Sequence, residues 1–190
     1  MNFAFAYIDP DSYEITTMDS ETPASLFQET TAIKSMKSGT GALVEVYISI
    51  GGWTFSNDGT STQPVFSEIS SSSENRQKFA HNLVEFMVRY GFDGVDLDWE
   101  YPGAPDRGGK KEDTANFVLL IRTLRATFDR SARGGYGLTF TIPSSYWYLR
   151  WFDVPSLLDA GADWVNLMSY DCEIFTHCSV YTQSINTFCA

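Results

Sequence analysis

The sequence has little positive charge and no long apolar run. Its 190 residues contain 13 Lys and Arg against 24 Asp and Glu, a formal net charge of −11, with no basic cluster beyond Lys110–Lys111. Such a chain would repel a phosphate backbone, so no nucleic-acid partner is expected. Because no run of about 18 apolar residues occurs, no membrane span or membrane partner is expected either. The N-terminus has no basic region and no apolar stretch of the kind that is typical of a signal peptide.

Cysteines are few and lie together near the end of the sequence. Cys172, Cys178 and Cys189 are an odd, clustered set, which is not typical of a disulfide framework. With His177 they match no familiar zinc spacing, so incidental cysteines are favoured and neither a metal nor another cofactor is expected. What the sequence does have is 43% hydrophobic and 15% aromatic residues. That composition supports one domain with a sizeable core, and aromatic faces suit an uncharged ligand such as a sugar ring.

Short β-rich runs recur along the chain and predict strands. Most are apolar on both faces, as buried parallel strands are. The predicted strands are 2–8, 42–50, 93–99, 137–142 and 164–170.

Two strongly amphipathic helices lie between these strands. In residues 74–91 apolar side chains repeat at helical spacing, with Ser73 as the expected N-cap and Gly91 as a left-handed stop. The same spacing recurs in residues 113–129, behind Asp113 as the expected cap.

The segment GFDGVDLDWEYPG, residues 91–103, alternates acidic and apolar side chains. Successive side chains of a strand point to opposite faces, so Asp96, Asp98 and Glu100 share one face. Carboxylates two positions apart lie about 6.5–7 Å apart along a strand, close enough to perturb each other's ionisation. The acidic face is therefore expected to line a site. A calcium loop is disfavoured, because such loops place Gly and polar residues, rather than Val, Leu and Trp, between their ligands.

Strand, loop, helix and strand alternate through the chain, which indicates a parallel sheet. Weaker helices are expected at 23–37 and 154–160, and long polar loops follow two strands at 52–64 and 101–113. Either a (β/α)8 barrel or a doubly wound sheet fits this order. Inward-pointing acids at the carboxyl end of a strand favour the barrel, and the absence of a nucleotide-binding glycine motif disfavours the open sheet. We therefore predict an α/β fold of the (β/α)8 TIM barrel class.

Four motifs in register resemble glycoside hydrolase family 18, the chitinases and their relatives. DGVDLDWE (93–100) is similar to the family's D-x-x-D-x-D-x-E signature. SIGGW (49–53), NFAFA (2–6) and MSYD (168–171) are similar to motifs on its third, second and sixth barrel strands. Four motifs in the family's order are far more specific than one.

The resemblance covers residues 1–171, a partial catalytic barrel, and leaves 172–190 as a divergent tail. Within it, residues 101–109 and 143–153 look most like fungal, killer-toxin-like chitinases. When the sequence is compared with the eight barrel strands of the family, only strands two to six can be identified. The barrel is therefore expected to be incomplete. A (β/α)8 barrel normally needs about 250 residues. We therefore expect the 190 residues as written to have open sheet edges and no turnover of their own.

The resemblance implies internal cleavage of chitin by a substrate-assisted, retaining mechanism. Glu100 would be the general acid that protonates the glycosidic oxygen. Asp98 would hold the acetamido N–H of the substrate, and Asp96 would tune Asp98. Tyr170 would hydrogen-bond the acetamido oxygen. A neighbouring negative charge and partial burial are expected to keep a proton on Glu100 near neutral pH.

The same motifs supply further candidates for contact with the sugar chain. These substrate-binding candidates are Asp171, Met168, Trp99, Tyr101, Gly51, Gly52 and Phe5. Without the motifs, Tyr170 and Met168 would be taken for core residues, and the two glycines for a simple turn. Trp99 also alternates with the acids, so it is expected to anchor the strand against the helices. A further aromatic group either stacks on sugars or packs a loop: Tyr146, Trp147, Tyr148 and Trp151.

Two hypotheses for function stay open at this point. The first is an enzyme that hydrolyses chitin, with chitin or N-acetylglucosamine oligomers as its partners. The second is a non-catalytic chitin-binding or inert protein with a chitinase-like core. The intact acidic row favours the first, and the missing strands favour the second. By resemblance alone, a secreted, extracellular protein is expected.

Overall fold

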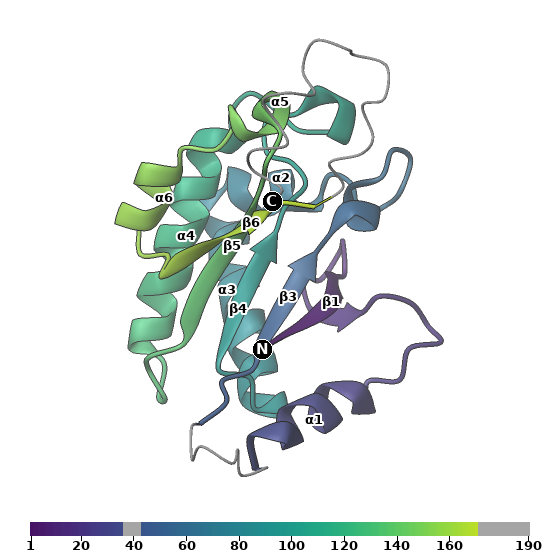
Figure 1. Cartoon of the computed structure of the whole chain (residues 1–190), viewed down its shortest axis with the longest axis vertical. Helices are drawn as coiled ribbons and strands as arrows, with labels where there is room; N and C mark the ends of the chain where they lie inside the picture. The colour runs from purple at the N-terminus through teal and green to yellow at the C-terminus, as the bar shows by residue number, and fades with distance from the viewer. Residues whose placement is uncertain (36–42, 171–190) are drawn as a thin grey trace.

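The computed structural model describes residues 1–35 and 43–170 and contains a curved, six-stranded sheet (Figure 1). Its strands are β1 (Asn2–Ile8), β2 (Ile15–Thr17), β3 (Tyr47–Gly51), β4 (Gly94–Asp98), β5 (Gly137–Pro143) and β6 (Trp164–Met168). They lie in the order β2-β1-β3-β4-β5-β6. Each neighbouring pair from β1 to β6 is parallel, and β2 runs antiparallel to β1. All five predicted strands are present, although the strand predicted at 42–50 begins only at Tyr47 and the one predicted at 164–170 ends at Met168. The short β2 was not predicted.

Helices fill the connections between the parallel strands. They are α1 (Ser25–Ala32), α2 (Val65–Ser71), α3 (Ser73–Tyr90), α4 (Asp113–Arg130), α5 (Tyr146–Leu149) and α6 (Val154–Asp159), with the 3-10 turns η1 (Ile33–Ser35), η2 (Trp53–Ser56) and η3 (Pro105–Arg107). In Figure 1, α2, α3 and α4 lie behind the sheet, and the opposite face of the sheet turns toward the viewer. This arrangement is consistent with part of a (β/α)8 barrel. Among the described strands, β2 and β6 form the edges of the sheet.

The helix ends agree with the sequence predictions in part. Gly91 adopts the left-handed conformation after α3, as expected, with φ of 79°. The N-cap of α3 is Ser72 rather than Ser73, because the Ser72 hydroxyl accepts from the Asn75 amide at 3.1 Å. The prediction that Asp113 caps α4 is wrong. Asp113 is the first residue of that helix, and its buried carboxylate holds neighbouring segments instead.

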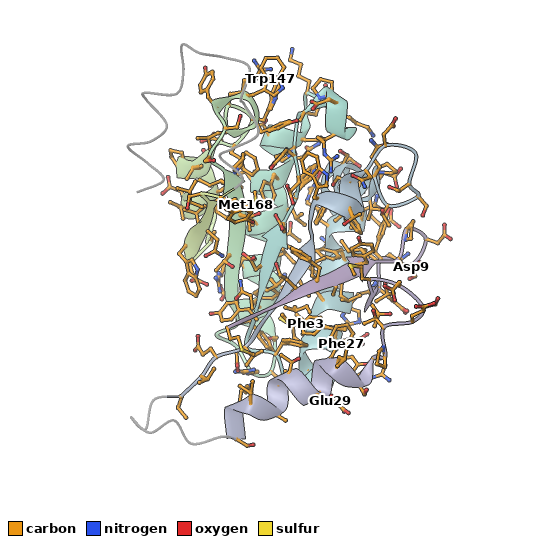
Figure 2. All side chains as sticks on the ribbon, turned by 45° about the vertical axis from the view of Figure 1, so that its right-hand side comes forward. Phe3, Asp9, Phe27, Glu29, Trp147 and Met168 are labelled. Carbon is orange, nitrogen blue, oxygen red and sulfur yellow. The ribbon has the colours of Figure 1, made fainter. Side chains whose placement is uncertain are left out.

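The predicted apolar stripes make the core between helices and sheet. The buried apolar residues of the two long helices are Phe79, Ala80, Leu83, Phe86, Met87, Phe117, Leu120, Ile121, Leu124 and Phe128. Val95 and Leu97 of β4 belong to the same cluster and are fully buried. In Figure 2, Phe3 of β1 points toward Phe27 of α1, and their ring centroids lie 5.3 Å apart. The odd-numbered face of β4 therefore packs under the helices, as the alternation predicts.

Asp93 fixes the start of β4. Its carboxylate accepts from Lys34 Nζ at 2.7 Å, from Arg133 Nη2 at 2.5 Å and from the Val46 amide at 2.9 Å. Burial alone would raise the pKa of Asp93, but these hydrogen bonds together lower that pKa below its ordinary value. Asp93 therefore has a structural role at the start of β4.

Asp96 collects hydrogen bonds from four parallel strands. Ser49 on β3 donates to it at 3.0 Å and Thr139 on β5 at 2.6 Å. Asn166 on β6 and Asn2 on β1 also donate to it, at 2.9 and 3.4 Å. These last two strands lie two positions away from β4 on either side, and a flat sheet would separate them from β4 by about 9.5 Å. The sheet therefore curls around Asp96, which places the acidic face on its concave side.

Asp96→Ala should lower the free energy of unfolding by about 2–6 kcal/mol. The substitution removes the acceptor of two buried hydroxyls, those of Ser49 and Thr139, and each buried donor without its acceptor costs about 1–3 kcal/mol. Urea unfolding followed by circular dichroism measures the change. Asp58→Ala, in an exposed loop, is the control and should stay within about 0.5 kcal/mol of the parent. Equal stability of the Asp96→Ala variant and the parent would contradict this role.

Candidate active site

Three carboxyl groups stand in a row where β4 ends. Asp96 and Asp98 belong to β4, and Glu100 follows two residues later. These residues are buried, with 2%, 4% and 6% of their surface exposed. The parallel strands run in the same direction, so their carboxyl ends meet at one edge, at the top of the sheet in Figure 1. In barrels this edge is the one that carries active sites.

Asp98 is the central group of the row. Its Oδ1 accepts a hydrogen bond from the Thr141 hydroxyl on β5, and its main-chain carbonyl accepts from the Gly52 amide at 2.9 Å. Burial raises the pKa of Asp98 to about 7, and the negative charge of Glu100 adds to the effect, whereas the bond from Thr141 opposes it. A carboxyl with this pKa changes its charge close to neutral pH.

Glu100 also has a raised pKa, but the cause differs in part from the sequence prediction. Burial raises it, as expected. The hydrogen bond from the Tyr101 hydroxyl and the positive charge of Arg107 lower it again. The predicted repulsion between neighbouring carboxylates acts on Asp98 instead. The two carboxyl groups together therefore retain a proton near neutral pH.

Tyr101 joins the acidic row to an aromatic cluster. Its ring stacks on Tyr148 with the centroids 4.3 Å apart, and the Tyr148 hydroxyl donates to Asp106 Oδ2 at 2.6 Å. Burial and the charge of Glu100 raise the pKa of Tyr101, so the phenol stays protonated and can donate to the carboxylate. The structure thus places the buried Tyr101 beside the Glu100 carboxylate, and its contact with substrate stays a prediction.

Gly51, Gly52 and Phe5 lie together beside Asp98. A Cβ on Gly51 would stand 2.3 Å from the Asp98 carbonyl oxygen, and the φ of Gly51 is +111°. Only glycine allows β3 to pass so close to β4 at this point. The Phe5 ring lies against Gly52, 3.2 Å from where a Cβ would stand. These three predicted residues are therefore at the site's edge of the sheet, where the glycines also make the turn.

Trp99 is not brought to the acidic face. Its ring stacks on Phe66 of α2, with centroids 5.4 Å apart and planes 17° apart, and meets Phe117 of α4 at 5.4 Å. The residue is 3% exposed. The prediction that Trp99 binds substrate is therefore wrong, because its odd position on the strand points it toward the helices. The alternative expectation, that it anchors the strand, is confirmed.

Met168 and Tyr170 lie at the carboxyl end of β6, the same edge of the sheet. Met168 is half-buried and pairs with Pro143 of β5 in the sheet register, whereas Tyr170 is 65% exposed. Figure 2 shows Met168 at the end of its strand. Asp171 lies outside the described residues, as do Cys172, Cys178, Cys189 and His177.

The aromatic group near residue 150 divides into two pairs. Tyr148 stacks on Tyr101, and the Trp151 ring lies 2.8 Å from where a Cβ on Gly103 would stand, so these two pack the loops. Tyr146 is 78% exposed and Trp147 56% exposed. Figure 2 shows Trp147 beyond the carboxyl ends of the strands. Of these four residues, this second pair is the more exposed, although the Arg150 guanidinium covers one face of the Trp147 ring, 4.0 Å from its centroid.

Sequence reasoning missed the polar partners of the acids. Ser49, Thr139, Thr141 and Asn166 all point to the concave side, where they hydrogen-bond Asp96 or Asp98. Small polar residues at alternate positions of apolar strands were the signal, as in Thr139 and Thr141 on either side of a phenylalanine. Arg107 was also missed, because nothing in the polar loop 101–113 indicates that this side chain is buried.

Asp98→Asn should flatten the dependence of stability on pH. In the folded state the raised pKa keeps a proton on Asp98 that the unfolded chain releases above about pH 4. The contribution of Asp98 to stability is therefore fully present below about pH 4, falls as the pH rises, and is lost above pH 7. The melting temperatures of parent and variant, measured from pH 4 to 8, should converge at the acid end and favour the variant above pH 7. Parallel curves would contradict the raised pKa.

In residues 1–35 and 43–170, no three His, Cys, Asp or Glu side chains are grouped so that they could hold a metal ion. None of the helices there is both long and apolar enough to cross a bilayer.

Comparison with known proteins gives consistent matches. The model of the family "Glycosyl hydrolases family 18" matches residues 1–180. The killer toxin subunits alpha/beta of Kluyveromyces lactis are 34% identical over 175 residues, which cover 90% of this chain and 14% of that protein. The endochitinase of Manduca sexta is 31% identical over 172 residues, which cover 89% of this chain and 29% of that protein.

Solved structures agree with the sequence matches. Catalytic domain 2 of the Group II chitinase of Ostrinia furnacalis has a TM-score of 0.75 and 32% identity, over 90% of this chain and 42% of that domain structure. A mutant of the same domain, solved in complex with penta-N-acetylchitooctaose, has the same TM-score. The chain therefore spans less than half the length of these relatives.

Proposed function

The chain belongs to glycosyl hydrolase family 18, and on this premise we propose that its protein hydrolyses chitin. The proposed reaction is internal cleavage of β-1,4-linked N-acetylglucosamine chains with retention of configuration. The single observation that carries the proposal is the buried row of Asp96, Asp98 and Glu100 at the carboxyl end of β4. Such a row costs stability in a protein that does not use it, because buried charges of one sign repel.

Glu100 is the general acid of the proposed mechanism. A general acid must hold a proton at the working pH and then deliver it to the leaving oxygen. Burial raises the pKa of Glu100, and burial with the charge of Glu100 raises that of Asp98 to about 7. Ionising both would place two negative charges side by side in a buried site, so the pair keeps one proton near neutral pH. That proton is available to the glycosidic oxygen at Glu100.

The substrate supplies the nucleophile in this proposal. Its 2-acetamido carbonyl attacks the anomeric carbon as the bond to the leaving oxygen breaks, and an oxazolinium ion forms. Asp98 accepts the acetamido N–H and stabilises the positive charge, while Tyr170 donates to the acetamido oxygen. Water then opens the ion from the opposite side and gives its proton to the Glu100 carboxylate, which restores the acid. Two inversions at the same carbon give overall retention.

The remaining candidates hold the sugar chain. Asp96 tunes Asp98: it is fixed by four hydrogen bonds of its own, and its negative charge adds to the raised pKa of Asp98. Tyr101, Met168 and Asp171 would line the position of the reacting sugar. The partners are therefore chitin or N-acetylglucosamine oligomers. By family, we further propose that the protein acts outside the cell.

A second candidate function is chitin binding without turnover. It is favoured by one observation, the exposed rings of Tyr146, Trp147 and Tyr170 at the carboxyl edge of the sheet. Aromatic faces of this kind stack on sugar rings whether or not a bond is cut. Because the chain spans 42% of the solved catalytic domain, binding and turnover have to be measured separately.

One experiment separates the two candidates. The protein and its Glu100→Gln variant are mixed with N-acetylglucosamine hexamer, with products followed by mass spectrometry and binding by calorimetry. Shorter oligomers from the parent, and only binding by the variant, would support hydrolysis. Binding by both without products would favour the second candidate. No binding by either protein would contradict both.

A further inference from the structure

Arg107 is a buried cation that connects the two longest loops at the site. It ends η3, in the segment that follows β4, and is 8% exposed. Its Nε donates to the Glu100 main-chain carbonyl at 3.1 Å, and its Nη1 donates to Asn57 Oδ1 at 3.2 Å. Its Nη2 donates to the Trp53 carbonyl. Both Trp53 and Asn57 belong to the segment after β3, so one rigid planar group joins the chain after β3 to the chain after β4.

The same guanidinium stacks on the Trp53 ring. Its Cζ lies 3.7 Å from the ring centroid, and Trp53 is still 52% exposed. A planar guanidinium can stack on an indole and donate in its own plane at the same time, whereas a lysine ammonium cannot. Burying the charge is costly unless its donors are satisfied, and here all three nitrogens have an acceptor.

We propose that Arg107 is a positioning residue that holds the Trp53 ring and Glu100 in one fixed relation. A sugar chain that lies on the exposed part of Trp53 would then present its glycosidic oxygen to Glu100. The inference rests on the proposed role of Glu100 as the acid. It adds a residue that touches neither the sugar nor the reacting atoms, and that acts through two groups that do.

Arg107 also belongs to the charged surroundings of Glu100. The groups that face Glu100 are Asp98 of β4, Tyr101 after β4, Arg107 of η3 and, behind the Tyr101 ring, Tyr148 of α5 with its partner Asp106. Burial raises the pKa of Glu100, and Tyr101 and Arg107 lower it. Removing the positive charge should therefore move the titration of Glu100 to higher pH, and replacing it with another cation should not.

The test compares Arg107→Gln with Arg107→Lys. The glutamine variant loses both the positive charge and the planar guanidinium group with its several donors. The lysine variant keeps the charge and loses only the planar group. Both should lower kcat/KM on N-acetylglucosamine oligomers by about 10²-fold, the order expected when reacting groups are misplaced by about 1 Å. Only the glutamine variant should shift the Glu100 carboxyl resonance, followed by ¹³C NMR against pH and assigned with Glu100→Gln. This titration does not depend on turnover.

Arg150→Gln is the matched control. Arg150 is exposed and stacks on Trp147 at 4.0 Å, so it has the same arginine–tryptophan contact away from Glu100. Its substitution should leave the Glu100 titration unchanged. Thermal melts of every variant show whether each is folded. If the glutamine variant is unfolded, kcat/KM of the lysine variant is the measurement that tests the proposal.

Each outcome bears on one claim. Parent kcat/KM in the lysine variant, or a rate loss in both variants without a shift in the glutamine titration, would overturn the positioning role. Hydrolysis that survives Glu100→Gln would instead overturn the proposed function, and the titration would still report on Arg107.

Discussion

In a version of the protein with the complete catalytic domain, replacing Glu100 with Gln should lower the rate of chitin-oligomer hydrolysis by about 10²–10⁴-fold, while oligomer binding stays close to that of the parent. The amide has almost the same shape as the acid but has no proton to give the leaving oxygen. The side chain is buried, and the Tyr101 hydroxyl that donates to the carboxylate can also donate to the amide oxygen, so geometry is preserved while the chemistry is lost. Turnover of a natural oligomer and of an activated aryl glycoside is the measurement.

The activated substrate sharpens this prediction. An aryl leaving group needs little protonation, so the variant should lose less activity on it than on the natural oligomer. Glu112→Gln, an exposed residue just before α4, is the matched control and should keep parent rates. Natural-oligomer hydrolysis at the parent rate in Glu100→Gln would exclude the acid role.

Fully deacetylated oligomers should not be cut, although N-acetylated oligomers of the same length are. In the proposed mechanism the substrate's own acetamido carbonyl forms the first bond to the anomeric carbon. The acidic row offers no second nucleophile at the anomeric carbon in this account, because Asp96 is tied to four strands and Asp98 accepts from Thr141. Removing the acetyl group therefore removes the nucleophile.

This second prediction needs a test that separates binding from chemistry. Oligomers with a single acetyl group at a known position are compared by product analysis, and calorimetry reports whether the deacetylated chain still binds. Cleavage should occur only after an acetylated sugar. Equal rates on acetylated and deacetylated chains would exclude substrate assistance.

Periodicity was enough to predict the sheet and the acidic row. The alternation in residues 93–99 placed the buried acids on one face of the strand and Val95 and Leu97 on the other. The same alternation placed Trp99 on the face of Val95 and Leu97. The motif made Trp99 a substrate-binding candidate. Its odd position in the strand alternation, however, points its side chain toward the helices, where it stacks on Phe66. Local geometry was therefore a better guide than membership in a motif.

What could not be predicted depends on contacts between distant segments. Asp113 has the sequence context of a helix cap, yet its carboxylate accepts from Ser67 on α2 at 2.8 Å and from the Lys110 amide at 2.6 Å. In the sequence, the loop that contains Arg107 looks like a polar surface loop. The burial of Arg107 could not be predicted, because the three acceptors of its hydrogen bonds come from residues 53, 57 and 100. Such partners meet only once β3 and β4 are paired.

The configuration of the first product reports directly on substrate-assisted cleavage by the acidic row. The protein is mixed with N-acetylglucosamine hexamer in an NMR tube, and the anomeric proton of the new reducing end is recorded before mutarotation. The β anomer should appear first, and it should be absent with Glu100→Gln. First appearance of the α anomer would contradict the substrate-assisted mechanism and the roles assigned to Asp98 and Glu100.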